Sequence, residues 1–138
     1  MPALRRFLIL GTLLLTACDQ AGTSTALDRP TTSPSTVTAF NGTLRLLATD
    51  TYAFSVSKDG YVEVTLLGLA APPGTQVSIG IGTPSLTGTC ATNQTVMTGA
   101  GPSAQIIGTG LAGRLCVTLT DVGNLTDPAL YTITVASS

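Results

Sequence analysis

The sequence predicts an all-β fold, an antiparallel β-sandwich of about seven to nine short strands. Apolar and polar residues alternate along five separate segments after residue 50, which is the pattern of strands with one face packed and one face in water. Clusters of Gly, Pro, Asn and Asp separate these segments, and no stretch after residue 18 repeats apolar residues at helical spacing. The composition agrees: charged residues make up only 9% of the chain, and hydroxyl side chains replace them, as in many exported β-domains.

The predicted strands follow one another with clear turn signals between them. The alternating segments are residues 52–56, 61–66, 77–81, 115–119 and 131–135. The turn signals are Lys58-Asp59-Gly60, Pro72-Pro73-Gly74, Ala112-Gly113 and the segment 124–128. Because many short strands share about 100 residues, a sandwich fits better than a closed barrel.

The N-terminus has the parts of an export signal. Arg5 and Arg6 form a short positive region, residues 7–15 are largely apolar, and small residues follow. At about 1.5 Å per residue, this run is too short to cross a hydrocarbon core of about 30 Å as a helix. The segment therefore predicts a cleaved signal peptide over residues 1–17.

The tail of this signal, Leu15-Thr16-Ala17-Cys18, resembles the lipobox of bacterial lipoproteins. In that family the cysteine thiol receives a diacylglyceryl group, cleavage precedes the cysteine, and the new amine can be acylated. The resemblance implies that Cys18 is lipidated, with palmitate among the acyl chains, and that a membrane of the bacterial cell envelope holds the chain on its extracytoplasmic side. An ordinary secretory signal with a chance cysteine is the alternative. Asp19 resembles an inner-membrane retention signal of some envelopes, or is a polar linker residue.

The mature chain divides into a tether over residues 18–36 and a β-sandwich domain over residues 37–138. The tether is rich in Ser, Thr and Pro, and Leu27 is its only large apolar residue, so it cannot bury enough surface to fold alone. After removal of residues 1–17, four scattered cations face seven acids. Nucleic acid is therefore not an expected partner, because phosphate binding needs clustered Lys and Arg.

The domain resembles bacterial pre-peptidase C-terminal domains over roughly residues 38–136. The similar segments are Phe40 to Leu44, Asp50 to Val56, Gly60 to Val64, Gly113 to Val117 and Tyr131 to Val135. The chain departs from that family in having no acid between Thr75 and Thr83, and in having Leu115 and Cys116 in place of an aromatic pair. The resemblance implies a jelly-roll-like sandwich that serves as an accessory module and not as a catalyst.

Cys90 and Cys116 are the two cysteines that remain after Cys18 is lipidated. In an oxidising envelope the pair predicts a disulfide, and two unpaired buried thiols are the alternative. Cys116 lies on the register opposite Leu115 and Val117, so the bridge is expected to hold the long connection before Cys90 against the outer face or an edge of the sheet.

The sequence indicates no catalytic residues, no resident metal and no cofactor. The chain has no His, which removes Ser-His and Cys-His pairs. Lys58 is the only lysine and lies in a predicted turn. A calcium site formed by Asp121, Asn124 and Asp127 is the one candidate that we retain, because hard cations bind loop oxygens; turn formation by the same residues is the alternative.

For binding, Tyr61 is the candidate residue, because it lies on the register opposite Val62 and is expected to be exposed, whereas Tyr52 and Tyr131 share the apolar register. The expected function is that of a non-catalytic envelope lipoprotein whose sandwich binds a protein or glycan partner. A small envelope enzyme with an unrecognised site and a purely structural surface-coat module are the alternatives.

Overall fold

The computed structural model describes residues 36–138, and these form an all-β unit. The predicted signal peptide, the predicted lipidation site Cys18 and most of the predicted tether lie outside the described residues. Within residues 36–138 no helix could span a bilayer. The strands are β1 (Thr36–Leu44), β2 (Thr49–Val56), β3 (Gly60–Leu69), β4 (Val77–Pro84), β5 (Cys90–Thr98), β6 (Ile106–Gly110), β7 (Gly113–Thr120) and β8 (Ala129–Ser137).

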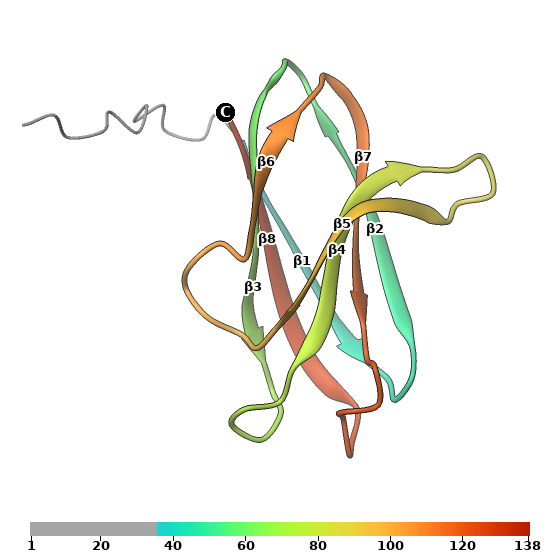
Figure 1. Ribbon diagram of the computed structural model, residues 1–138, viewed down its shortest axis with the longest axis vertical. Coiled ribbons are helices and arrows are strands. Elements are labelled where there is room, and N and C mark those ends of the chain that lie inside the picture. Colours follow the sequence, from blue (N-terminus) through green and yellow to red (C-terminus); the bar gives the residue numbers. More distant parts are fainter. Residues whose placement is uncertain (1–35) are drawn as a thin grey trace, which may run out of the picture. The chain divides into compact units, whose positions relative to one another are not determined.

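The eight strands form two antiparallel sheets, with orders β1-β8-β3-β6 and β2-β7-β4-β5. The first strand pairs with the last, the second with the seventh, the third with the sixth and the fourth with the fifth. This nested pairing, rolled into two sheets, is the arrangement of a jelly roll. Figure 1 shows the two sheets face to face, so the sandwich and the jelly-roll-like order expected from the sequence are confirmed.

The core lies between the sheets and follows the alternation of each strand. In β8, every second residue from Ala129 onward is buried and its neighbours are more exposed. The core consists mainly of Leu44, Val56, Val62, Val64, Leu66, Val77, Ile79, Ile106, Val117, Leu119, Leu125, Tyr131, Ile133 and Val135. Both sheets, this core and the one disulfide lie within residues 36–138, so this part of the chain contains what an independent folding unit needs.

All five alternating segments lie inside strands. Two turn signals lie between strands, and the other two end on the first residue of the next strand, Gly60 of β3 and Gly113 of β7. Two differences from the expectation concern the middle of the chain. The long connection that we expected before Cys90 is in part strand, since β4 continues to Pro84. Strand β5 is largely exposed on both faces, and for this reason its residues show no alternation of apolar and polar types.

Candidate functional site

The hairpin of β4 and β5 extends away from the sandwich as an arm, seen at the right of Figure 1. Its tip, residues 85–89, is closed by backbone hydrogen bonds from Ser85 N to Thr89 O (2.7 Å) and from Gly88 N to Ser85 O (3.1 Å). Gly88 has a φ of 83°, which glycine adopts without strain. The hydroxyl of Ser85 also bonds those of Thr87 and Thr89, at 2.9 and 2.7 Å. These hydrogen bonds fix the conformation of residues 85–89.

A disulfide holds the base of the arm against the sheet. Cys90 at the start of β5 bonds Cys116 on β7, with the two Cα atoms 5.8 Å apart. The strands that it joins are not neighbours, because β4 lies between them. Gly82 of β4 allows the backbone of β5 to come close to β4, since a Cβ at this position would overlap the backbone of Ala91. The predicted disulfide is thus confirmed, and Cys116 is completely buried although it lies on the outward register of β7.

A groove of about 590 Å³ lies between the arm and the outer face of β2 and β7. The sheet contributes Thr51, Ala53, Arg114 and Cys116, and the arm contributes Thr83, Pro84, Ser85, Leu86 and Gly88. The groove therefore combines hydroxyl groups, short apolar surfaces and one guanidinium.

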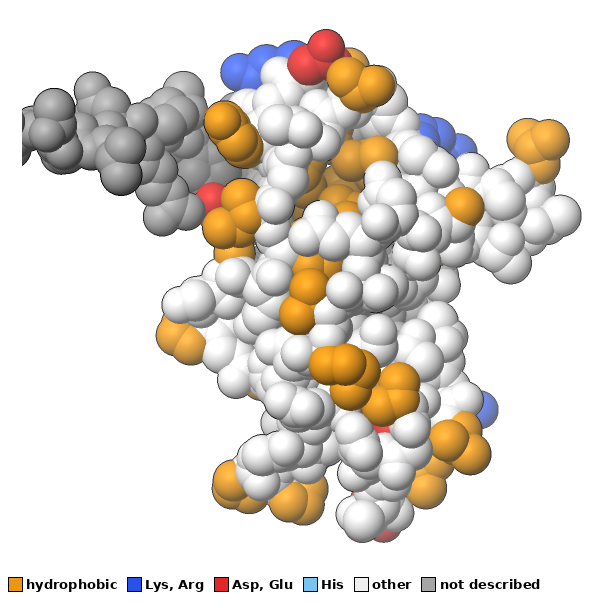
Figure 2. All heavy atoms as spheres, viewed as in Figure 1, with side chains coloured by type: hydrophobic (Ala, Val, Ile, Leu, Met, Phe, Trp, Pro, Cys, Tyr) orange, Lys and Arg blue, Asp and Glu red, His pale blue; other side chains and the backbone are white. Residues whose placement is uncertain are grey.

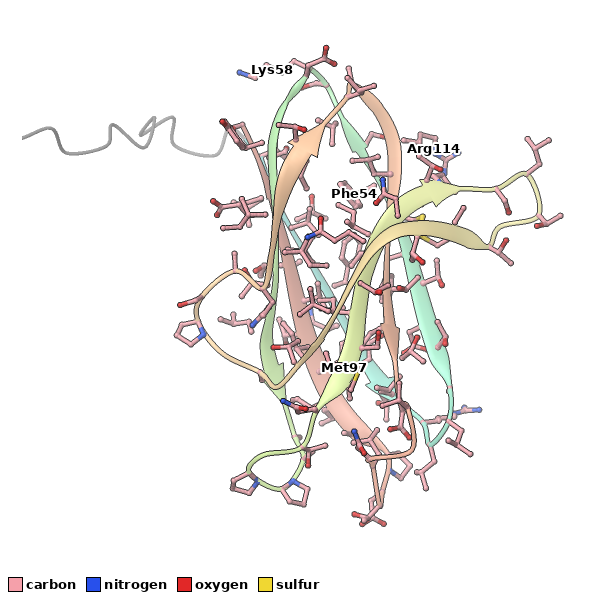
Figure 3. All side chains as sticks on the ribbon, viewed as in Figure 1. Phe54, Lys58, Met97 and Arg114 are labelled. Atoms are coloured by element: carbon pink, nitrogen blue, oxygen red, sulfur yellow. A yellow bond between two sulfur atoms is a disulfide. The ribbon has the colours of Figure 1, made fainter. Side chains whose placement is uncertain are left out.

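Arg114 is the charged group of this groove. It is exposed and lies two residues before Cys116 on the same face of β7. Figure 3 places it close to the base of the arm. Because its side chain is exposed, its guanidinium can reach an external acceptor. A guanidinium offers a planar fork of N–H groups that matches a carboxylate, and the neighbouring hydroxyls can donate or accept hydrogen bonds.

A second hollow of about 540 Å³ lies between the two sheets, where β6 and β5 form the sheet edges. Val62, Ile81, Ile106 and Leu115 are among its lining residues, together with the side chains of Asn93 and Gln94. Figure 2 shows hydrophobic side chains at the bottom of this hollow. No ionised side chain lines it, so the groove beneath the arm is the stronger candidate for selective binding.

Tyr61, the binding candidate from the sequence, is 48% exposed on β3. It belongs to the other sheet and does not line the groove. Tyr131 is buried and Tyr52 packs against the core, as their register predicted. Arg114 was missed as a site residue, although its position on the same register as Cys116 was a usable signal.

Each of the three candidate calcium ligands has a hydrogen-bond partner among the described residues. The Asp121 carboxylate accepts backbone N–H bonds from Leu47 (2.8 Å) and from residues 123–125 (2.9–3.1 Å). Asn124 donates its amide to Gln76 O, and Asp127 accepts from Thr126. These N–H bonds lower the pKa of Asp121, and the bond from Leu47 has the largest effect. Burial acts in the opposite direction. In this geometry the Asp121 carboxylate caps two loops with its negative charge.

Sequence comparison adds no relationship: no protein-family model matches the chain, and no curated protein does.

Proposed function

We propose that the chain is a non-catalytic lipoprotein of the bacterial cell envelope, and that its sandwich is a binding module. Anchorage through Cys18 is supported by the signal and lipobox pattern of residues 1–18. Binding is supported above all by one observation, the groove that the exposed Arg114 lines together with a disulfide-held arm.

The groove suits a partner that carries a carboxylate, either a protein or an acidic glycan of the envelope. Arg114 would pair with the carboxylate, Thr51 and Ser85 would bond neighbouring polar groups, and Leu86 would cover an apolar portion. Among residues 36–138, no carboxylate or imidazole lines the groove. Its chemistry therefore favours recognition over acid–base catalysis.

Lipidation is tested on the mature N-terminus. Mass spectrometry should find a thioether-linked diacylglyceryl group on Cys18, and Cys18→Ser should leave the membrane fraction or accumulate as uncleaved precursor. A free Cys18 thiol, or cleavage at another position, would contradict the anchor.

Binding is tested by placing a photo-cross-linking residue at Leu86, with Tyr61 and Leu130 as exposed positions on the other sheet. We expect a discrete adduct in intact cells from position 86 and none from the other two. Arg114→Gln should reduce its yield about tenfold, since a hydrogen-bonded charge pair contributes about 1.5–3 kcal/mol. Digestion with protease or glycosidase then separates a protein partner from a glycan. An adduct from position 61 alone, or a yield unchanged by Arg114→Gln, would contradict the groove.

A further inference from the structure

The turn between β1 and β2 presents two leucines at the end of the sandwich remote from Thr36. Leu46 is 45% exposed and Leu47 is 77% exposed. Val122, on the adjacent loop between β7 and β8, is also exposed. The two loops lie against each other, because a Cβ built on Gly123 would come within 3.6 Å of Leu47 Cδ2. We call Leu46, Leu47 and Val122 the apolar tip.

The backbone of the apolar tip is strained at one residue. Leu47 has a φ of 56° and is the only non-glycine residue among those described with a positive φ. Leucine rarely adopts this left-handed conformation, whereas Gly or Asn would adopt it readily. The turn therefore keeps a large apolar side chain at a position where the backbone favours another residue. Strain at an exposed position suggests a use for the side chain itself.

Hydrogen bonds hold this conformation in place. Leu47 N donates to Asp121 Oδ2 at 2.8 Å, and the turn closes with Ala48 N donating to Arg45 O at 3.2 Å. Asp121 N in turn donates to Ala48 O at 3.0 Å. The leucines consequently project from a rigid support that joins both loops.

We propose that the apolar tip inserts into a lipid surface. Its three side chains are exposed, and a bilayer can receive exposed apolar side chains without a preformed pocket. Arg45 is exposed beside Leu46, so its guanidinium can reach an anionic lipid headgroup while the leucines enter the acyl region. The neighbouring loop carries two acids. Asp121 is buried beneath the tip and accepts four backbone N–H bonds, the one from Leu47 included. Asp127 lines a depression with Ala70 and Pro72.

The proposal is distinct from the lipid anchor, because it uses only residues of the sandwich. The lengths of the tether and of the sandwich allow the lipid anchor and the apolar tip to contact one membrane. Between Cys18 and Thr36 the chain extends at most about 60 Å at about 3.4 Å per residue. Strand β1, with nine residues, is about 30 Å long. The apolar tip of an anchored chain can therefore contact the same bilayer.

The test uses residues 36–138, which contain both sheets, the core and the disulfide. Sedimentation with vesicles of equimolar phosphatidylglycerol and phosphatidylethanolamine should show binding. Leu47→Asn should lower the partition coefficient about tenfold, because a largely exposed leucine no longer enters lipid. Its melting temperature should stay the same or rise, because Asn tolerates a positive φ. Arg45→Gln should weaken binding several-fold on these vesicles and have little effect on pure phosphatidylcholine.

The matched control is Leu111→Asn, which removes another highly exposed leucine from the opposite end of the sandwich. It should leave vesicle binding unchanged. The proposal is overturned if the unaltered domain does not bind the vesicles, in which case a protein partner would have to cover the apolar tip. It is also overturned if Leu111→Asn and Leu47→Asn reduce binding equally, or if Leu47→Asn unfolds the domain.

Discussion

Tyr131 of β8 and Asp50 of β2 connect the two sheets directly, through a 2.6 Å hydrogen bond from the tyrosine hydroxyl to the carboxylate. The Tyr52 hydroxyl lies 2.6 Å from that of Tyr131. Because the single hydroxyl proton of Tyr131 goes to Asp50, Tyr52 is the donor to Tyr131. The Asn41 carbonyl oxygen, at 3.3 Å, is a second and more distant acceptor for the Tyr52 hydroxyl. Tyr52 also stacks on Phe40 of β1, with ring centroids 4.7 Å apart. These contacts join the edge strands at one side of the sandwich.

Tyr131→Phe should destabilise the domain by about 1–3 kcal/mol, because Asp50 loses a donor and Tyr52 loses an acceptor at a partly buried site. Chemical denaturation at pH 7 measures this change. Tyr61→Phe, which removes an exposed hydroxyl from β3, is the control and should stay within about 0.5 kcal/mol. Equal effects of the two substitutions would show that the connection between the sheets contributes nothing specific.

The same tyrosine predicts a loss of stability at alkaline pH. Burial, followed by the hydrogen bond to Asp50, raises the pKa of Tyr131 above its ordinary value of 10.0. Above that pH the unfolded chain releases this proton while the folded chain retains it, so stability present below pH 10 declines as the pH rises further. The stability difference between the unaltered domain and Tyr131→Phe should therefore narrow between about pH 10 and 12. A constant difference would contradict the raised pKa.

Gly42→Ala should be destabilising by about 1–3 kcal/mol, since inserting a methyl group into a packed site forces its neighbours to move. A Cβ at this position would lie 2.5 Å from the Tyr131 hydroxyl oxygen and 2.7 Å from that of Tyr52. Gly68→Ala on β3 provides the control, because its Cβ would meet nothing within 4 Å. Thermal melts of the two variants should differ clearly, and similar melts would show that the tyrosine pair adapts without cost.

Asp121→Asn should lower the melting temperature by more than about 5 °C, because an amide replaces a carboxylate that receives four backbone N–H bonds. The lowered pKa of Asp121 means that this stabilisation is present above the ordinary value of 3.8 and is lost as the pH falls through the lower folded value. The advantage over Asp121→Asn should shrink below about pH 4. Asp127→Asn, on the same loop but exposed, should have little effect at either pH.

Reduction of the Cys90–Cys116 bond should destabilise the domain by about 3 kcal/mol in the chain-entropy model, since the cysteines are 26 residues apart. The fold should survive, because the core between the sheets does not depend on the bridge. Circular dichroism should retain the β signal while the melting temperature falls, and protease should cut within residues 85–89. Complete unfolding on reduction would mean that the arm supports the sandwich as well as being held by it.

The amino-acid sequence by itself determined the fold class and much of the strand pattern, because alternation and turn chemistry are local properties. Val62 and Val64 face the core, as the alternation of apolar and polar residues in this segment predicted. The chain turns at Lys58-Asp59-Gly60, as these turn-forming residues predicted. The disulfide was predicted because two cysteines remain after Cys18 in a chain that is expected to enter an oxidising envelope.

Only the tertiary structure decided which distant residues meet. Asp50 and Tyr131 are 81 positions apart, and their contact depends on the order of the strands and on the distance between two sheets, which alternation does not specify. Likewise, Asp121 is of a residue type that serves both in turns and as a metal ligand. Only the hydrogen bond from Leu47 N makes its carboxylate a cap for two loops. The groove at Arg114 arises because a disulfide crosses an intervening strand at Gly82. Such sites depend on long-range packing, and this is why the sequence predicted the strands but not the surface that they build.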